Sequence, residues 1–248
     1  MARTTSPQHR QALGFFERHG NVHIYVANLI GYARVAFAAY AFAVALSSPG
    51  RMVTAYWLSF VCDELDGRFA RMFNQTSTLG TVMDMVTDRV ATSCLLCILC
   101  VLVPTATPLF LAILGLDIFS HWFQMYATLV AGAASHKDVH SSSAIIRTYY
   151  RHRLFMGACC ICCEVLYLSL YLLAWPQWRA AWPVALPPAL AARLPPRFAP
   201  DEVPAVALLA LAALPGTVIK QVVNVVQLRT AAQRLVEYDN KRDGRRRG

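Results

Sequence analysis

The sequence predicts an all-α polytopic membrane protein with six transmembrane helices, and three observations carry that prediction. Of its 248 residues, 56% are hydrophobic and only 15% are charged, whereas soluble domains hold about 45–50% apolar and about 25% charged residues. Six apolar segments are each long enough to cross a hydrocarbon core of about 30 Å as a helix. The basic residues, finally, are divided unevenly between the two sides that six spans define.

The predicted elements follow the hydropathy along the chain. Residues 1–23 are polar and basic and are expected to form a cytoplasmic N-terminal segment, either as a short interfacial helix or as a tail. A six-helix membrane domain is predicted at residues 24–228, followed by a basic cytoplasmic tail at 229–248. The spans are expected at about 24–46, 52–73, 79–103, 108–130, 154–175 and 203–228.

The distribution of positive charge predicts the orientation. With six spans both termini share one side, and that side holds sixteen Lys and Arg against four on the other. Cytoplasmic loops carry the excess of Lys and Arg, so both termini are predicted to be cytoplasmic. The net charge of +9 is then mainly topology plus attraction to anionic membrane lipids. No nucleic-acid-binding motif is present, and no nucleic-acid partner is expected.

Acidic residues inside the second and third segments are the strongest functional signal. Asp63 and Asp66 are three residues apart, and Asp84 and Asp88 are four apart, so each pair shares one helix face. The connection at 74–78 is short, which makes the two helices antiparallel neighbours. At about 1.5 Å per residue, both pairs lie roughly 10 Å from the cytoplasmic end and can meet at one depth.

Four carboxylates at one depth need positive charge nearby. A charged side chain within a span costs roughly 2.5–3.5 kcal/mol on insertion scales, and such residues are usually functional. Two divalent cations would cancel four negative charges, and all-oxygen ligands suit Mg²⁺ or Mn²⁺. Paired ions of this kind serve phosphoryl transfer. The alternative is a structural set of ion pairs with Arg68, Arg71 or Arg89.

The spacing of these residues resembles a family signature. It reads Asp63-x-x-Asp66-Gly67-x-x-Ala70-Arg71, then eight residues, then Gly80-x-x-x-Asp84-x-x-x-Asp88. This resembles the CDP-alcohol phosphotransferase signature in every fixed position. The surrounding residues resemble the eukaryotic phosphatidylinositol synthases of that family: Asn28 to Arg34, Asp117 with Ser120-His121-Trp122, and Ser135-His136-Lys137.

The resemblance implies an enzyme that transfers the phosphatidyl group of CDP-diacylglycerol to myo-inositol, giving phosphatidylinositol and CMP. It implies two ions of Mg²⁺ or Mn²⁺ held by Asp63, Asp66, Asp84 and Asp88, with Asp88 also acting as the general base. It implies CDP-diacylglycerol binding by Gly67, Ala70, Arg71, Ser77, Gly80, Asn28 and Arg34. It also implies a homodimer in the endoplasmic reticulum membrane with a cytoplasmic active site, although the Golgi stays open.

Some of these residues have a second interpretation. Small residues in membrane helices usually allow close helix packing, which would explain the two glycines and Ala70 without a nucleotide. Ser77 could serve loop hydrogen bonding, and Arg34 could extend its side chain to the membrane surface.

An inositol pocket needs several hydrogen-bond donors and acceptors, because inositol is an uncharged polyol. The cytoplasmic segment between the fourth and fifth spans supplies them. The residues expected to bind inositol are His136, Lys137, Arg147, Ser135 and, from the fourth span, Asp117.

Two other functions remain open from the sequence. A transferase of the same family could use serine, choline or glycerol 3-phosphate as acceptor. A cation transporter would also explain carboxylates in the membrane, but ion conduction needs neither the Asp-Gly nor the Ala-Arg spacing. The eight cysteines lack a zinc-binding pattern and are expected to pack as small apolar residues.

Overall fold

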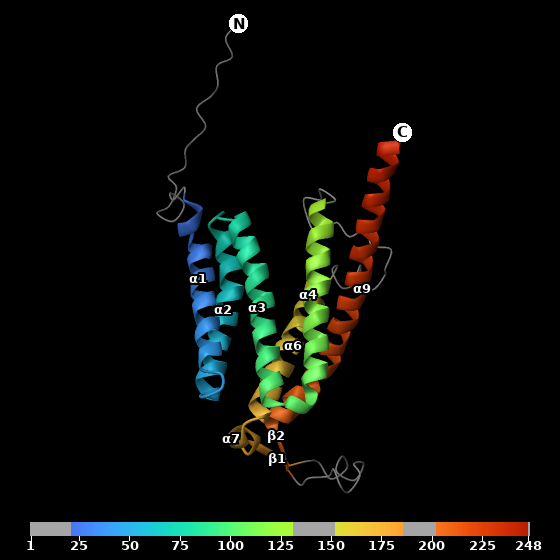
Figure 1. Cartoon of the computed structure of the whole chain (residues 1–248). Coiled ribbons are helices and arrows are strands. Elements are labelled where there is room, and N and C mark those ends of the chain that lie inside the picture. Colours follow the sequence, from blue (N-terminus) through green and yellow to red (C-terminus); the bar gives the residue numbers. More distant parts are fainter. Residues whose placement is uncertain (1–20, 131–151, 186–201, 248) are drawn as a thin grey trace. The chain divides into compact units, whose positions relative to one another are not determined.

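The computed structural model describes residues 21–130, 152–185 and 202–247, and nearly all of them are helical (Figure 1). The predicted all-α class is confirmed. The described elements are η2 (Val22–Ile24), α1 (Val26–Ala43), α2 (Pro49–Met72), α3 (Thr78–Leu102), η3 (Pro104–Ala106), α4 (Thr107–Val130), α6 (Arg153–Leu173), α7 (Pro176–Arg179), β1 (Pro183–Ala185), β2 (Glu202–Pro204) and α9 (Ala205–Arg247). Of the predicted N-terminal segment, all but residues 21–23 lies outside the described part.

Five helical stretches in the described part are long and apolar enough to cross a membrane, which makes the chain a polytopic membrane protein. They are Val26–Ala43, Thr78–Leu102, Pro104–Val130, Leu154–Leu173 and Ala205–Arg242. The predicted second span, α2, is not among them, because its C-terminal half is rich in acidic and basic residues. The count of six therefore stays a prediction.

The chain divides into two compact units, Met1–Ala91 and Thr92–Gly248. In the first unit α1 and α2 pack along their length, with the start of α3 beside them (Figure 1). The buried residues at this packing are mostly small: Ala27, Ala38 and Ala41 on α1, and Ala55 on α2. Small side chains let two helix backbones approach closely, which is the usual basis of helix packing in membranes.

The connection from α2 to α3 has a regular hydrogen-bond pattern. Asn74 adopts a left-handed conformation, with φ of 53°, which Asn tolerates better than most residues. The amide of Gln75 then donates to the carbonyl of Ala70 at 2.8 Å, which closes the end of α2 in a Schellman motif. Ser77 immediately precedes α3 and caps it, because its hydroxyl accepts from the amide of Gly80 at 2.9 Å.

In the second unit α9 packs against both α6 and α4 (Figure 1). Its apolar core includes Tyr167 and Tyr171 of α6 and Val223 of α9. Two of its buried polar side chains bond to another polar side chain. Thr92 donates to Glu164 at 3.2 Å, and Lys220 donates to Asn224 at 2.7 Å. Such pairing is required in a membrane, where an unpaired polar group has no water to bind.

The last helix is longer than the sequence indicates. The predicted span ends at residue 228, whereas α9 runs for 43 residues and continues through the segment predicted as a tail. Residues 229–248 include six arginines and two alanines, and both residue types are strong helix formers. Basic residues in its last turns also favour a helix C-terminus.

Candidate active site

Carboxylates from two helices meet in the first unit. One oxygen from each of Asp63, Asp66 and Asp84 lies within 4.8 Å of the other two. The three-residue spacing on α2 places both of its aspartates on one face, and the short capped connection sets α3 antiparallel to it. The structure thus brings together three of the four aspartates that the sequence singled out.

The fourth aspartate contacts an arginine from α1. Arg34 is 5% exposed, and its Nη2 pairs with the Oδ1 of Asp88. Its Nη1 donates to the Oδ1 of Asp84 at 2.8 Å and lies 2.6 Å from the Oδ1 of Asp63. One guanidinium therefore links three carboxylates from two other helices.

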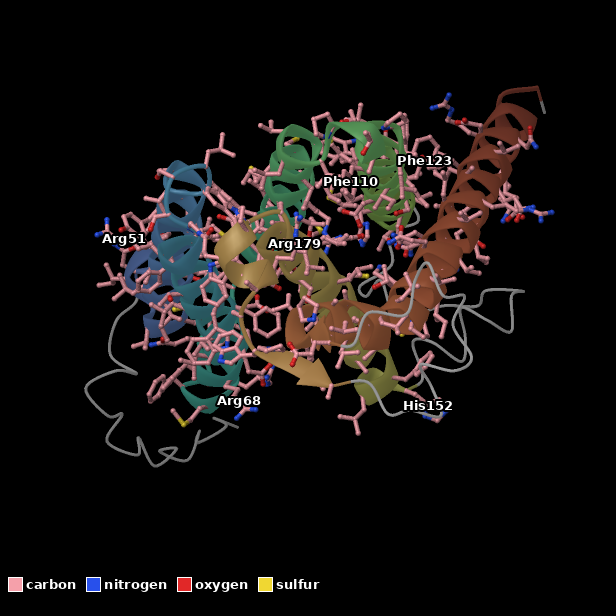
Figure 2. All side chains as sticks on the ribbon, turned by 90° about the horizontal axis from the view of Figure 1, so that it is seen from below. Arg51, Arg68, Phe110, Phe123, His152 and Arg179 are labelled. Carbon is pink, nitrogen blue, oxygen red and sulfur yellow. The ribbon has the colours of Figure 1, made fainter. Side chains whose placement is uncertain are left out.

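Sequence reasoning did not foresee this partner. It named Arg68, Arg71 and Arg89 as the arginines that could pair with the aspartates. Arg68 instead pairs with Glu64 at 2.6 Å on an exposed face and points outward (Figure 2). Arg89 does form an ion pair with an aspartate, a longer one of 3.9 Å between its Nη2 and the Oδ2 of Asp88. The suggestion that Arg34 extends to the membrane surface is wrong, because its side chain is buried among the carboxylates.

A pocket of about 210 Å³ adjoins the carboxylates. Six of the seven residues expected to bind CDP-diacylglycerol line it, and Arg34 is the exception. The complete lining is Ala27, Asn28, Asp66, Gly67, Ala70, Arg71, Gln75, Thr76, Ser77, Gly80, Thr81, Met83 and Asp84. Two of the clustered aspartates thus face this pocket directly.

The two glycines of the pocket differ in what surrounds them. A Cβ on Gly67 would meet only the terminal nitrogens of Arg71, at 3.5 and 3.8 Å. A Cβ on Gly80 would come within 2.8 Å of Asn28 Oδ1 and 3.1 Å of Ser77 Oγ. Gly67 therefore leaves space on the pocket side, whereas Gly80 allows α3 to approach α1.

Hydrogen bonds link the α2–α3 connection, which lines the pocket, to the start of α1. Asn28 is 1% exposed, donates to the carbonyl of Val22 at 2.6 Å and lies 3.4 Å from the hydroxyl of Ser77. The side chain of Gln75 accepts from the amide of Val26 at 2.9 Å. Sequence reasoning missed Gln75, which follows the turn residue Asn74 and carries no motif signal.

The chemistry of this site suits phosphate groups and a hard cation. The capped start of α3 borders the pocket, and helix N-termini favour anions. Arg71 adds a guanidinium at the pocket wall, a group that can bind phosphate through two nitrogens. The all-oxygen donor set of the aspartates fits Mg²⁺ or Mn²⁺.

Of the residues expected to bind inositol, only Asp117 is among the described residues. His136, Lys137, Arg147 and Ser135 lie outside the described residues. Asp117 is on α4 in the second unit, where it is 6% exposed, and its Oδ1 lies 3.4 Å from Nδ1 of His121.

Comparison with known proteins assigns the family. The family model described as CDP-alcohol phosphatidyltransferase matches residues 24–187, a range that includes every aspartate of the cluster. The chain belongs to this family.

Curated relatives of this CDP-alcohol phosphatidyltransferase cover most of its length. A protein of Arabidopsis thaliana named "Probable CDP-diacylglycerol--inositol 3-phosphatidyltransferase 2" is 43% identical over 220 residues, 88% of this chain and 92% of the relative. The CDP-diacylglycerol--inositol 3-phosphatidyltransferase of Saccharomyces cerevisiae is 38% identical over 224 residues, 88% of each chain. The human protein of that name is 39% identical over 153 residues, 61% of this chain and 72% of its own. No solved structure matches the chain.

Proposed function

We propose that this CDP-alcohol phosphatidyltransferase transfers the phosphatidyl group of CDP-diacylglycerol to myo-inositol and releases CMP. The observation that carries the proposal is similarity over nearly the full length of relatives named for this reaction, covering 92% of each of the two Arabidopsis thaliana proteins. The geometry supports it, since aspartates and a phosphate-suited pocket adjoin within one unit.

The aspartates are proposed to hold two ions of Mg²⁺ or Mn²⁺. Asp63, Asp66 and Asp84 offer oxygens within 4.8 Å of one another, and Asp88 lies one helical turn after Asp84. When bound, the ions would neutralise the diphosphate and stabilise the oxygen of the departing CMP.

The pocket is proposed to bind the CDP group. Gly67 and Ala70 leave room against α2, and Arg71 would hold a phosphate from the pocket wall. The start of α3, capped by Ser77, would offer backbone amides to the same phosphates. Asn28 and Gly80 would act by keeping α1, α3 and their connections together.

Asp88 is proposed to act as the general base. It would take the proton of an inositol hydroxyl, and the oxygen so activated would attack the phosphorus that carries the diacylglycerol. The bond from that phosphorus to the oxygen of CMP would break, and its electron pair would leave with CMP. General-base assistance of this kind contributes about 10²–10⁴-fold in rate.

The acceptor is proposed to bind through residues that combine donors and acceptors. These are His136, Lys137, Arg147, Ser135 and Asp117, which together can satisfy several hydroxyl groups. We choose inositol as the acceptor because the relatives are named for transfer to inositol.

The membrane topology is proposed to comprise six spans, with α2 as the second. The amide of Val26 at the start of α1 bonds the side chain of Gln75 just before α3, at 2.9 Å. The end of α2 thus lies beside the start of α1. If α1 crosses the membrane in one direction, α2 crosses it again in the opposite direction. Its 24 residues give about 36 Å as a helix, which is sufficient.

Six spans place both termini on one side, and the sixteen-to-four distribution of Lys and Arg makes that side cytoplasmic. The active site would face the cytoplasm. We place the protein in the endoplasmic reticulum membrane, with the Golgi as the alternative, and as a homodimer.

The proposal is tested with purified protein, CDP-diacylglycerol, Mn²⁺ and a panel of acceptors. CMP release should require myo-inositol, and phosphatidylinositol should be the lipid product. Release with serine, choline or glycerol 3-phosphate but not with inositol would replace the acceptor while keeping the family reaction.

A further inference from the structure

Arg34 lies among the carboxylates and not in the nucleotide pocket. Its Nη1 is 2.6 Å from Asp63 and 2.8 Å from Asp84, and its Nη2 pairs with Asp88. It is absent from the pocket lining, although the family resemblance had grouped it with the nucleotide-binding residues. Its position therefore suggests an action through the aspartates.

The backbone of Arg34 is also held in place. The hydroxyl of Ser59 on α2 donates to the carbonyl of Arg34 at 3.1 Å, and both residues are at least nine-tenths buried. A guanidinium is planar, and its nitrogens have a fixed geometry. With its backbone and its terminal nitrogens both fixed, Arg34 determines where the bound carboxylate oxygens lie.

We propose that Arg34 is a positioning residue that orients the general base Asp88 and aligns it with Asp63 and Asp84. The proposal rests on the proposed function, which gives Asp88 its role. With Oδ1 of Asp88 held by Nη2, the other oxygen is the one that accepts the proton of the acceptor alcohol. The same positive charge reduces the repulsion among the clustered carboxylates.

This role needs arginine and not only a positive charge. Nη1 serves Asp63 and Asp84 while Nη2 serves Asp88, so two separate nitrogens act at once. The single ammonium of lysine is a compact charge at the end of a flexible stem. It would keep the charge balance but could not hold both groups of carboxylates in this arrangement.

The test compares Arg34→Lys and Arg34→Gln with the wild type, with Arg68→Lys as the matched control. Arg68 lies on α2 and pairs with Glu64 on an exposed face. We would measure kcat and KM for both substrates at saturating Mn²⁺, and CMP binding as a reading of the pocket and the fold. Arg34→Lys should lower kcat about 10- to 100-fold, the size expected for a lost charged hydrogen bond.

In the same Arg34→Lys protein, KM for CDP-diacylglycerol and CMP binding should stay at the wild-type values, and Arg34→Gln should lower kcat further. Arg68→Lys should match the wild type throughout. A wild-type kcat in Arg34→Lys would overturn the inference. So would a raised KM for CDP-diacylglycerol at unchanged kcat, or loss of CMP binding in both Arg34 variants.

Failure of the proposed function is a separate result. It would appear in the wild-type protein, as no CMP release with myo-inositol. The kcat comparison would then be made with the acceptor that the panel identifies.

Discussion

At the scale of single residues, four aspartates and one buried arginine lie together in the first unit. The carboxylates would repel one another in a low-dielectric environment, and Arg34 supplies charge to three of them. Small residues line part of the pocket beside them, and Gly67 among them leaves open space on the pocket side. Single substitutions should therefore affect substrate binding, helix packing or catalysis separately, depending on the residue that is changed.

The two pocket glycines should respond differently to alanine. In Gly67→Ala the new methyl group meets only the flexible end of Arg71, so the protein should fold normally while KM for CDP-diacylglycerol rises. In Gly80→Ala the methyl group meets Asn28 at 2.8 Å. Overpacking of this kind costs about 1–3 kcal/mol, so the melting temperature in detergent should fall.

Steady-state kinetics and thermal melting of both variants check this pair of outcomes. A Gly80→Ala protein as stable as the wild type would show that α1 and α3 do not approach each other closely there. A Gly67→Ala protein with unchanged KM would remove that position from the nucleotide pocket.

At this scale the sequence predicted residue types better than partners. Asp63, Asp66 and Asp84 were found because their spacing sets them on facing sides of two adjacent helices. The pairing of Arg34 was not found, because it joins residues 50 and 54 positions apart and depends on the rotation of α1. Gln75 was missed for the same reason, since only the folded connection brings it to Val26.

At the scale of helices, close packing depends on a few small residues. In the second unit, a Cβ on Gly216 of α9 would lie 2.5 Å from Sγ and 2.7 Å from Cβ of Cys162 on α6. Gly216 follows Pro215, which lies inside the helix. The cysteines at this surface thus act as packing residues, as the sequence suggested.

Gly216→Ala should destabilise the protein by about 1–3 kcal/mol, because the methyl group would force α6 and α9 apart. Gly115→Ala on α4 is the control, since a Cβ there would meet no atom within 4 Å. Alanine in an open helical position should be neutral or stabilising by about 0.5–1 kcal/mol. Denaturation of both variants in detergent measures the difference, and equal stability of the two would refute the packing argument.

Helix boundaries show what the sequence left undetermined at this scale. The apolar segments predicted the existence of the helices, because hydropathy is a strong signal. It could not predict that α9 extends to Arg247, because a polar sequence of helix formers can be either helix or tail. The end of α2 was set by a local signal, the left-handed Asn74.

At the scale of the whole molecule, the topology depends on whether α2 crosses the membrane. Hydropathy selects five helices in the described part, while the contact of Gln75 with Val26 returns α2 to the start of α1. An even number of spans puts both termini on one side. An odd number would put them on opposite sides.

Protease protection in sealed microsomes distinguishes these topologies. A tag after Gly248 and a tag before Met1 should both be digested from outside, since both termini are proposed to be cytoplasmic. A tag inserted within residues 186–201 should be protected until detergent is added. Protection of one terminal tag and digestion of the other would contradict six spans.

The most direct measurement is transfer of labelled myo-inositol into lipid by purified wild-type protein and the Asp88→Asn variant. Glu64→Gln is the matched control, because Glu64 pairs with Arg68 on an exposed face. Wild type and control should form phosphatidylinositol and CMP in equal amounts, and Asp88→Asn should be slower by about 10²–10⁴-fold while still binding CMP. Wild-type turnover in Asp88→Asn, or no lipid product in the wild type, would contradict the proposed reaction.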